Sequence, residues 1–149
     1  MKKYSIIALV LFGCISLTTA QTTFPTLEES LATAKENQKK VLMVFSGSDW
    51  CKPCMQLKRS ILNQQEFAAF SQENLIVLEV DFPYRRKNRL PKEQRKHNEQ
   101  LAEQYNQEGS FPKVLLVDTT ANELGEISFQ PTQTPKDFIF QIETLLSNR

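Results

Sequence analysis

Two cysteines separated by two residues, Cys51 and Cys54, follow directly on a short apolar segment and a turn. Residues 41–45 are apolar and rich in β-forming types, residues 46–49 have the composition of a turn, and the residues after Pro53 are compatible with a helix. The pair is therefore expected at a strand-to-helix junction. Two thiols at this spacing can form a reversible dithiol/disulfide couple, so the pattern predicts redox chemistry on an α/β scaffold.

The first part of the chain has the features of an export signal. Residues 1–20 carry two lysines directly after Met1, continue with an apolar stretch over residues 6–15, and end in the small residue Ala20. The remainder of the 149 residues, 40% hydrophobic over the full chain, fits a single folded unit. We therefore expect a signal peptide over residues 1–20 and one domain over residues 21–149. The protein is expected to be exported, into the periplasm if the source is a Gram-negative bacterium.

A second processing site competes with cleavage after Ala20. Residues 11–14 resemble a bacterial lipobox, in which Cys14 would be lipidated and would hold the chain on a membrane. Phe12 is bulky for that motif, so ordinary cleavage is the favoured interpretation. The mature chain then keeps only Cys51 and Cys54, which can form one disulfide at most.

The near balance of positive and negative charges excludes a strong electrostatic field around the whole protein. The full chain has 18 basic and 17 acidic residues, and loss of Lys2 and Lys3 would leave 16 basic residues. No nucleic-acid binding is expected, and membrane association is expected only if Cys14 is lipidated. One segment is nevertheless strongly basic, with Glu93 as its only acid; its cations are Arg85, Arg86, Lys87, Arg89, Lys92, Arg95 and Lys96. We interpret this segment as a solvated loop and helix face, the alternative being a docking site for an acidic partner.

The remaining patterns predict alternating helices and strands. A capping box at residues 26–29 opens a first helix, and Thr134 caps the last one. The predicted elements between them are a strand over 41–45, a helix over 53–71 with a kink or break near Asn63, a strand over 75–82, a helix over 91–108, and a hairpin of strands 112–117 and 123–129. Parallel strands joined by helical crossovers and followed by a hairpin indicate a three-layer α/β sandwich.

This order of elements resembles the thioredoxin superfamily over nearly the whole mature chain. The sequence Trp50-Cys51-x-x-Cys54 is similar to the active-site motif of that family, and Gly109-Ser110-Phe111-Pro112 to its loop with a cis-proline. The chain is also similar to exported bacterial thioredoxin-like proteins, including the soluble domains of thiol:disulfide interchange proteins. The resemblance implies a mixed central sheet flanked by helices.

Two features depart from the family pattern. Thioredoxins usually place a buried aspartate six residues before the first cysteine, where this chain has Phe45. Their usual proton shuttle is therefore missing or replaced. The stretch 83–104 is also longer than in a minimal thioredoxin, which could alter the choice of partner.

The cysteines are expected to carry the chemistry. Cys51 should lie at a helix N-terminus, where unpaired N–H groups and the helix dipole favour the thiolate nucleophile. Cys54, one turn later and expected to be more buried, can resolve a mixed disulfide. Lys52 either favours the thiolate or points to solvent. Pro53 starts the helix and stiffens the motif.

Neighbouring residues are expected to contact substrates. Trp50 is interpreted as an apolar surface over the disulfide, with ordinary packing as the alternative. The resemblance implies that Pro112 is cis and that the backbone of Phe111 pairs with an incoming peptide, although a trans proline is common at a strand start. Asp49 is expected to be an exposed turn residue rather than a proton relay, and His97 a solvated side chain.

The expected function is therefore an exported thiol:disulfide oxidoreductase that exchanges Cys51–Cys54 with protein thiols and disulfides. Pro53 before Cys54 resembles the Gly-Pro pairing of thioredoxins and favours the reducing direction. No cofactor and no metal are expected, so a membrane thiol-relay protein is the expected electron donor. The alternatives are a non-catalytic binding module with a structural disulfide, and a metal chaperone that uses the dithiol.

Overall fold

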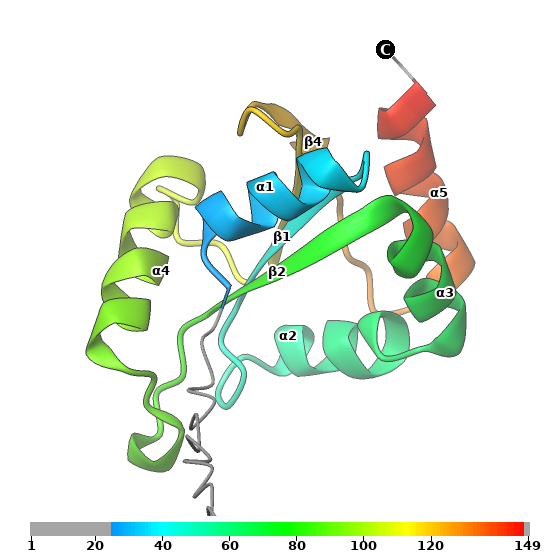
Figure 1. Ribbon diagram of the computed structural model, residues 1–149. Coiled ribbons are helices and arrows are strands. Elements are labelled where there is room, and N and C mark those ends of the chain that lie inside the picture. Colours follow the sequence, from blue (N-terminus) through cyan, green and yellow to red (C-terminus); the bar gives the residue numbers. More distant parts are fainter. Residues whose placement is uncertain (1–24, 148–149) are drawn as a thin grey trace, which may run out of the picture.

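The computed structural model describes residues 25–147, so the predicted signal peptide and the lipobox at Cys14 lie outside the described residues. The elements in chain order are α1 (Leu27–Glu36), β1 (Lys40–Ser46), α2 (Lys52–Leu57), the π-helical turn η1 (Lys58–Leu62), α3 (Gln65–Asn74), β2 (Leu75–Asp81), the 3-10 turn η2 (Arg86–Asn88), α4 (Lys92–Tyr105), β3 (Lys113–Val117), β4 (Glu123–Glu126) and α5 (Pro135–Ser147) (Figure 1). The alternation predicted from the sequence is confirmed.

The sheet is mixed, with strand order β2-β1-β3-β4. Strands β1 and β2 are parallel, in a register that pairs Ser46 with Asp81 at their carboxyl ends. Strand β3 instead runs antiparallel to both β1 and β4. Residues 106–112 return the chain to the carboxyl end of β1, where Phe45 pairs with Lys113. The segment before Lys113 therefore lies at the same end of the sheet as the turn that carries the cysteines.

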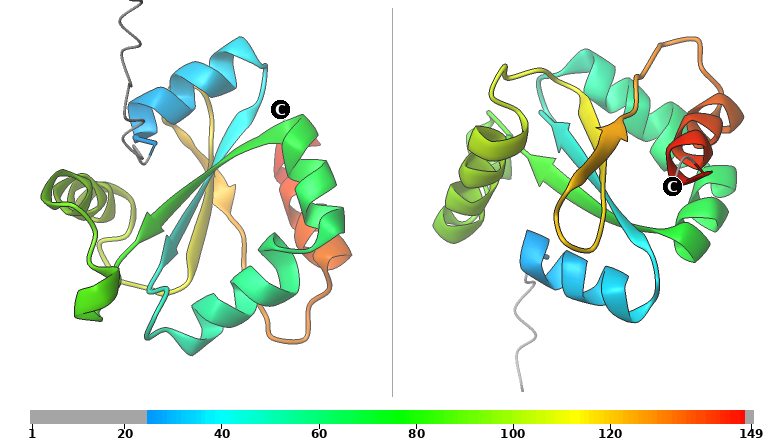
Figure 2. Two further views of the ribbon diagram at one scale, coloured as in Figure 1. Left: turned by 60° about the horizontal axis from the view of Figure 1, so that its bottom comes forward. Right: turned by 90° about the horizontal axis from the view of Figure 1, so that it is seen from above.

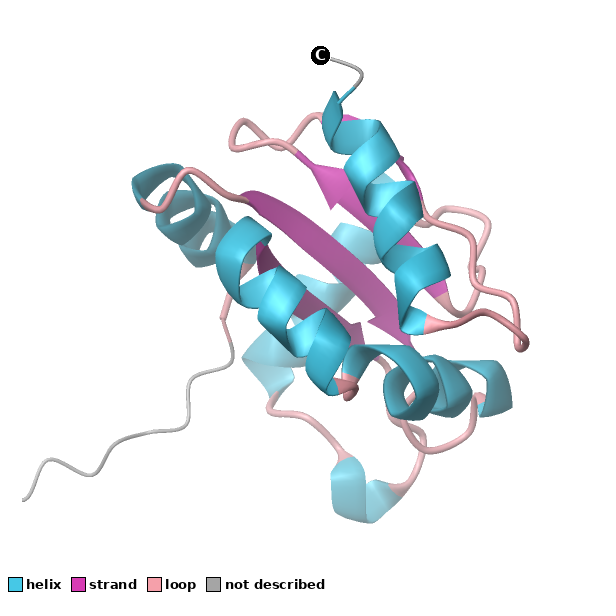
Figure 3. Cartoon of the chain, turned by 90° about the vertical axis from the view of Figure 1, so that its right-hand side faces the viewer, coloured by secondary structure: helices cyan, strands magenta, loops and turns pink. Residues whose placement is uncertain are grey.

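Helices cover both faces of this sheet (Figures 2 and 3). Successive residues of β1 point to opposite faces, as the strand period of two requires. Leu42 and Val44 join a core formed with α2, η1, α3 and α5, whereas Val41, Met43 and Phe45 join a core formed with α1 and α4. The continuous apolar run in β1 reflects burial on both sides. The predicted three-layer sandwich is therefore confirmed.

Local signals placed most element ends correctly. Thr26 and Glu29 form the predicted capping box of α1, and Thr134 and Asp137 exchange hydrogen bonds at the start of α5. The predicted break near Asn63 separates η1 from α3.

Two predicted elements extend too far. Helix α4 ends at Tyr105 rather than at residue 108, because the backbone of Asn106 leaves the helical region. The last strand ends at Glu126 rather than at residue 129, beyond a register shift between Leu116 and Val117. Among residues 25–147, none of the helices combines the length and apolar character that crossing a membrane requires.

Candidate active site

The two cysteines form a disulfide at the start of α2. The turn after β1 brings the Cys51 N–H to the carbonyl of Gly47 at 2.9 Å, and Cys51 is the N-cap residue of α2. Its Sγ is bonded to that of Cys54 at 2.01 Å and accepts the Cys54 N–H at 3.2 Å. The predicted position of Cys51 at a helix N-terminus is confirmed. At this position a thiolate on Cys51 is stabilised by unpaired N–H groups and the helix dipole.

The expected difference in burial between the cysteines is not present in this oxidised state. Cys51 is 5% exposed and Cys54 is 4% exposed. The disulfide holds both sulfurs within one helical turn, so the two cysteines are shielded from solvent to the same extent. Lys52 has an exposed side chain without a hydrogen bond to either sulfur within the described part of the chain. Pro53 lies in the first turn of α2, where the missing N–H costs nothing.

Trp50 is both an exposed apolar surface and a packed side chain, the two alternatives considered from the sequence. Its side chain is 49% exposed, yet its indole N–H donates to the carbonyl of Phe82 at 2.7 Å. Its ring meets Phe111 edge-on, with centroids 5.4 Å apart, and Phe111 in turn meets Phe82 at 5.6 Å. The three rings thus form an aromatic platform beside the disulfide, defined as Trp50, Phe82 and Phe111.

The indole lies directly against Gly47. A Cβ at this glycine would lie 2.2 Å from Cε2 of the Trp50 ring, closer than any real contact. Gly47 is therefore required by the close approach of the ring, which sequence reasoning missed.

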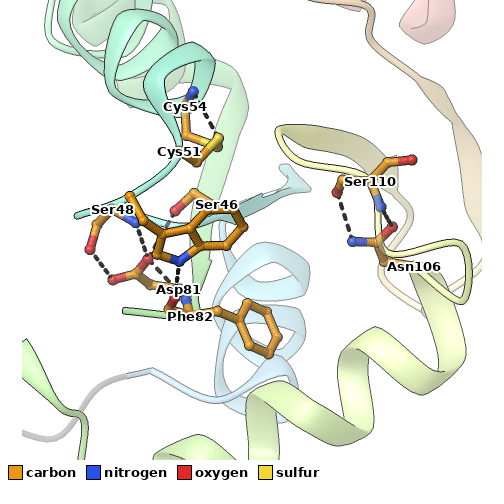
Figure 4. The surroundings of a disulfide bond; sticks show 9 residues. Ser46, Ser48, Cys51, Cys54, Asp81, Phe82, Asn106 and Ser110 are labelled. Atoms are coloured by element: carbon orange, nitrogen blue, oxygen red, sulfur yellow. Dashed lines mark hydrogen bonds between the residues drawn. A yellow bond between two sulfur atoms is a disulfide. The ribbon is translucent and has the colours of Figure 1, made fainter. Parts of the chain in front are cut away.

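The peptide bond between Phe111 and Pro112 is cis, as the family resemblance implied. The loop before it is held by Asn106, a 3% exposed side chain at the end of α4. The Asn106 amide accepts the Ser110 N–H at 3.0 Å and donates to the Ser110 carbonyl at 2.9 Å (Figure 4). This reciprocal pair places residues 110–112 next to Trp50. The sequence carried no signal for it, because Asn is common after a helix for local reasons alone.

Asp81 organises the opposite side of the turn. Its Oδ1 accepts the N–H of Ser48 at 2.8 Å and the hydroxyl of Ser46 at 3.2 Å, and its Oδ2 accepts the Ser48 hydroxyl at 2.6 Å (Figure 4). Buried Asn98 of α4 donates to the Asp81 carbonyl at 2.8 Å. The carboxylate therefore ties the ends of β1 and β2 together beneath Trp50. The sequence held a signal for this contact: two serines, Ser46 and Ser48, lie at and just after the end of one strand, and an acid, Asp81, ends the next.

Asp49 lies in the turn, as predicted, but it is partly buried rather than exposed, and it organises the following loop. Its carboxylate accepts the N–H groups of Tyr84 at 2.8 Å and Arg85 at 2.9 Å, and the Asn88 side-chain amide at 2.8 Å. Desolvation acts to raise the pKa of Asp49, but the hydrogen bonds from these three groups and the charge of Arg85 outweigh it and hold the pKa below 3.8. A lowered pKa moves this carboxyl group further from neutral pH and makes it a poorer proton relay.

A cavity of about 230 Å³ opens on the other side of Cys54. An ion pair between Lys58 and Glu79, 2.7 Å apart, lies in its wall, and each side chain is about half exposed. Such a solvated pair contributes little to stability. Phe45, at the position of the usual family aspartate, is fully buried in the core on the opposite face of β1.

His97 is not the solvated side chain expected from the sequence. It is partly buried, and its Nε2 accepts the N–H of Leu27 at 3.1 Å, which satisfies one of the free donors at the start of α1. Charged neighbours in the sequence hid this contact, which joins residues 70 positions apart. Within residues 25–147, no group of three or more His, Cys, Asp or Glu side chains is arranged to hold a metal ion.

A model of the thioredoxin-like domain family matches residues 27–140. The chain belongs to this family. It is 38% identical over 103 residues to the disulfide bond reductase DsbH of Chlamydia pneumoniae, covering 69% of this chain and 60% of that protein. The chain thus spans less than two thirds of that relative.

Solved structures agree on the fold. A structure of a DsbH oxidoreductase aligns with a TM-score of 0.74 at 28% identity, covering 99% of this chain and 96% of the other. A disulphide isomerase from Xylella fastidiosa aligns with a TM-score of 0.58 at 22% identity, over 78% of this chain and 87% of the other, and supports the fold alone. The predicted thioredoxin-like fold is confirmed.

Proposed function

We propose that the protein is a thiol:disulfide oxidoreductase that acts on protein substrates in the reducing direction. The observation that carries the proposal is the disulfide at the N-terminus of α2, with Cys51 as the N-cap residue and with the preceding Trp50 in contact with Phe111, the residue before the cis bond to Pro112. The similarity to a relative named as a disulfide bond reductase supports both the reaction and its direction.

The reaction begins with the reduced pair. The thiolate of Cys51 attacks one sulfur of a client disulfide, the client S–S bond breaks, and the other client sulfur leaves as a thiolate. Cys54, after losing its proton, then attacks Cys51 Sγ. The client sulfur leaves as its thiolate, and the Cys51–Cys54 disulfide forms. Two electrons pass from the protein to the client, so no bound cofactor is needed.

The surface around the disulfide suits a peptide substrate. The aromatic platform is half open at Trp50 and gives a flat apolar contact next to the reacting sulfur. Phe111 contacts the ring of Trp50 and precedes the cis bond to Pro112, and we assign the Phe111 backbone to pair with the client as an added strand. Lys52 and Pro53 act on the reactivity of Cys51 rather than on client contact.

Export and re-reduction complete the proposal. The basic and apolar features of residues 1–20 support export to an oxidising compartment. There the oxidised pair must receive two electrons from another dithiol, and a membrane thiol-relay protein is the donor class that fits.

One observation favours a second candidate, a binding module with a structural disulfide. Phe45 fills the place of the usual buried acid and is 0% exposed, so that position offers no base for Cys54. Such a module would keep its disulfide in all conditions.

Equilibration in graded glutathione buffers, read by alkylation and mass, separates the two functions. An oxidoreductase exchanges its disulfide completely and reversibly, and the midpoint potential gives the direction. A disulfide that resists reduction while the fold stays intact would leave only the binding module.

The Cys54→Ser variant then identifies the nucleophile. It should retain clients on Cys51 as mixed disulfides, which reducing gels would release. The matched Cys51→Ser variant should retain few or none. Equal trapping by both variants would contradict the assigned roles.

A further inference from the structure

A cluster of cations lies at the same end of the molecule as the disulfide. We define the basic loop as residues 83–91, which carry Arg85, Arg86, Lys87 and Arg89 and lead into Lys92 of α4. All five of these side chains are exposed, and none makes an ion pair within the part of the chain that the structure describes. The chain as a whole has a net charge of only +1, so this positive surface is local.

The basic loop is anchored to the residues that precede Cys51. Asp49 accepts hydrogen bonds from Tyr84, Arg85 and Asn88, so it fixes both the start of the loop and the end of η2. Asp49 offsets part of the charge of Arg85, whereas Arg86 and Lys87 project from the 3-10 turn. Figure 1 shows η2 at the same end of the fold as the turn before α2. Asp49, two residues before Cys51, therefore holds the basic loop at the end of the fold that carries the disulfide.

A shallow hollow connects the loop with the aromatic platform. It has a volume of about 330 Å³. Its lining residues are Trp50, Asp81, Phe82, Pro83, Tyr84, Arg95 and Glu99. Tyr84 is 85% exposed at its rim. The hollow itself carries one cation, Arg95, and two acids, Asp81 and Glu99, so the positive charge lies in the exposed basic loop that follows Tyr84 rather than in the hollow.

We infer that the basic loop is a docking surface for acidic peptide segments that flank the reacting cysteine of a client protein. The inference rests on the proposed function. Screening limits the reach of the cations to about 8 Å at physiological salt, so they act on client residues close to the target sulfur. Charge of this kind mainly raises the rate of association and selects among clients.

The test uses reduced protein and synthetic peptides whose single cysteine forms a disulfide with thionitrobenzoate. The peptides differ only in whether Glu, Ser or Lys flanks that cysteine. Attack by Cys51 on the peptide sulfur releases the coloured thionitrobenzoate thiolate and forms a mixed disulfide, from which Cys54 then releases the peptide as its thiol. At low salt the Glu peptide should react about three- to tenfold faster than the Ser peptide, and the Lys peptide more slowly. High salt should remove most of the difference.

Two matched variants locate the effect. R86Q/K87Q should bring the rates for the Glu and Ser peptides together. The control K35Q/K39Q removes the same charge at the opposite end of β1 and should keep the preference. A preference for Glu that survives R86Q/K87Q, or equal rates for all peptides in the unmodified protein, would overturn the inference. Failure to react with any peptide would instead count against the proposed function.

Anionic vesicles provide the remaining comparison. If the protein binds vesicles rich in phosphatidylserine through Arg86 and Lys87 but shows no preference among the peptides, the loop recognises membranes and the inference is wrong. Equal and weak binding of the unmodified protein and R86Q/K87Q to such vesicles, together with the Glu preference, would support it.

Discussion

The ring of Trp50 occupies the space in which a side chain at Gly47 would lie, with a Cβ position 2.2 Å from Cε2 of the indole. The turn between β1 and the disulfide is therefore shaped by one ring. Placement of that ring also fixes the aromatic platform, because the indole bonds to the Phe82 carbonyl and meets Phe111.

The substitution Gly47→Ala should displace the indole and break its hydrogen bond to Phe82. Overpacking of this kind costs about 1–3 kcal/mol in the free energy of unfolding. The chain has a single tryptophan, so its emission should shift to the red, and denaturant unfolding gives the energy. In a Trp50→Ala background the same glycine substitution should cost little. A full cost in that background would show that another contact is responsible.

Replacing Asn106 by Ala should loosen the loop before Pro112. The change removes both hydrogen bonds to the backbone of the exposed Ser110, and a typical intramolecular hydrogen bond contributes about 0.5–1.5 kcal/mol to stability. Urea unfolding should register this loss, and exchange with protein clients should slow. Ser110→Ala is the matched control, because Ser110 takes part only through its backbone. The prediction fails if both substitutions have the same small effect.

Restoring an acid by Phe45→Asp should unfold the protein rather than improve it. Phe45 is 0% exposed in an apolar core, so the change removes a ring and buries a carboxyl group without a partner. The expected loss is about 4 kcal/mol or more, whereas Phe45→Leu should cost about 1 kcal/mol. Thermal unfolding compares the two. A stable, folded Asp variant would mean that this site does provide polar partners for an acid.

Protonation of Asp49 should break its hydrogen bonds to the basic loop, at a pH below the ordinary pKa of an aspartate. The pKa of Asp49 is lowered in the fold, so its contribution is present at higher pH and is lost as pH falls through that lowered pKa. The amide resonances of Tyr84 and Arg85 should therefore shift with a midpoint below 3.8 in an NMR titration. Asp49→Asn should abolish this transition. A midpoint at or above 3.8 would contradict the hydrogen-bonded position of the carboxylate.

Features set by neighbouring residues could be predicted from the sequence, whereas features set by distant contacts could not. Thr26 and Glu29 are three positions apart, and Cys51 and Cys54 share one helical turn, so their geometry follows from local rules. Asp81 ends β2 and Ser48 lies in the turn after β1, so the two meet only because β1 and β2 pair. His97 was misread for the same reason.

The residues of the candidate site likewise fall into those that the sequence predicted and those that only the fold reveals. Cys51, Cys54, Trp50 and the cis bond at Pro112 lie in motifs that family resemblance covers. Asn106 lies outside those motifs and fixes one of them through two hydrogen bonds to the backbone. From the sequence alone, the Asn106 side chain could equally well be solvated at the end of a helix. Only the return of residues 106–112 toward β1 brings the Ser110 backbone within reach of its amide.

The central position of β1 also determines how the molecule carries mechanical load. A client held on Cys51 by a mixed disulfide pulls on the chain through the end of this strand. Because β1 is hydrogen-bonded to β2 on one side and β3 on the other, the pull acts along the strand and loads two ladders in shear at once. In the proposed reaction, a client that moves while bound to Cys51 would therefore pull on the sulfur while the sheet beneath it keeps its register.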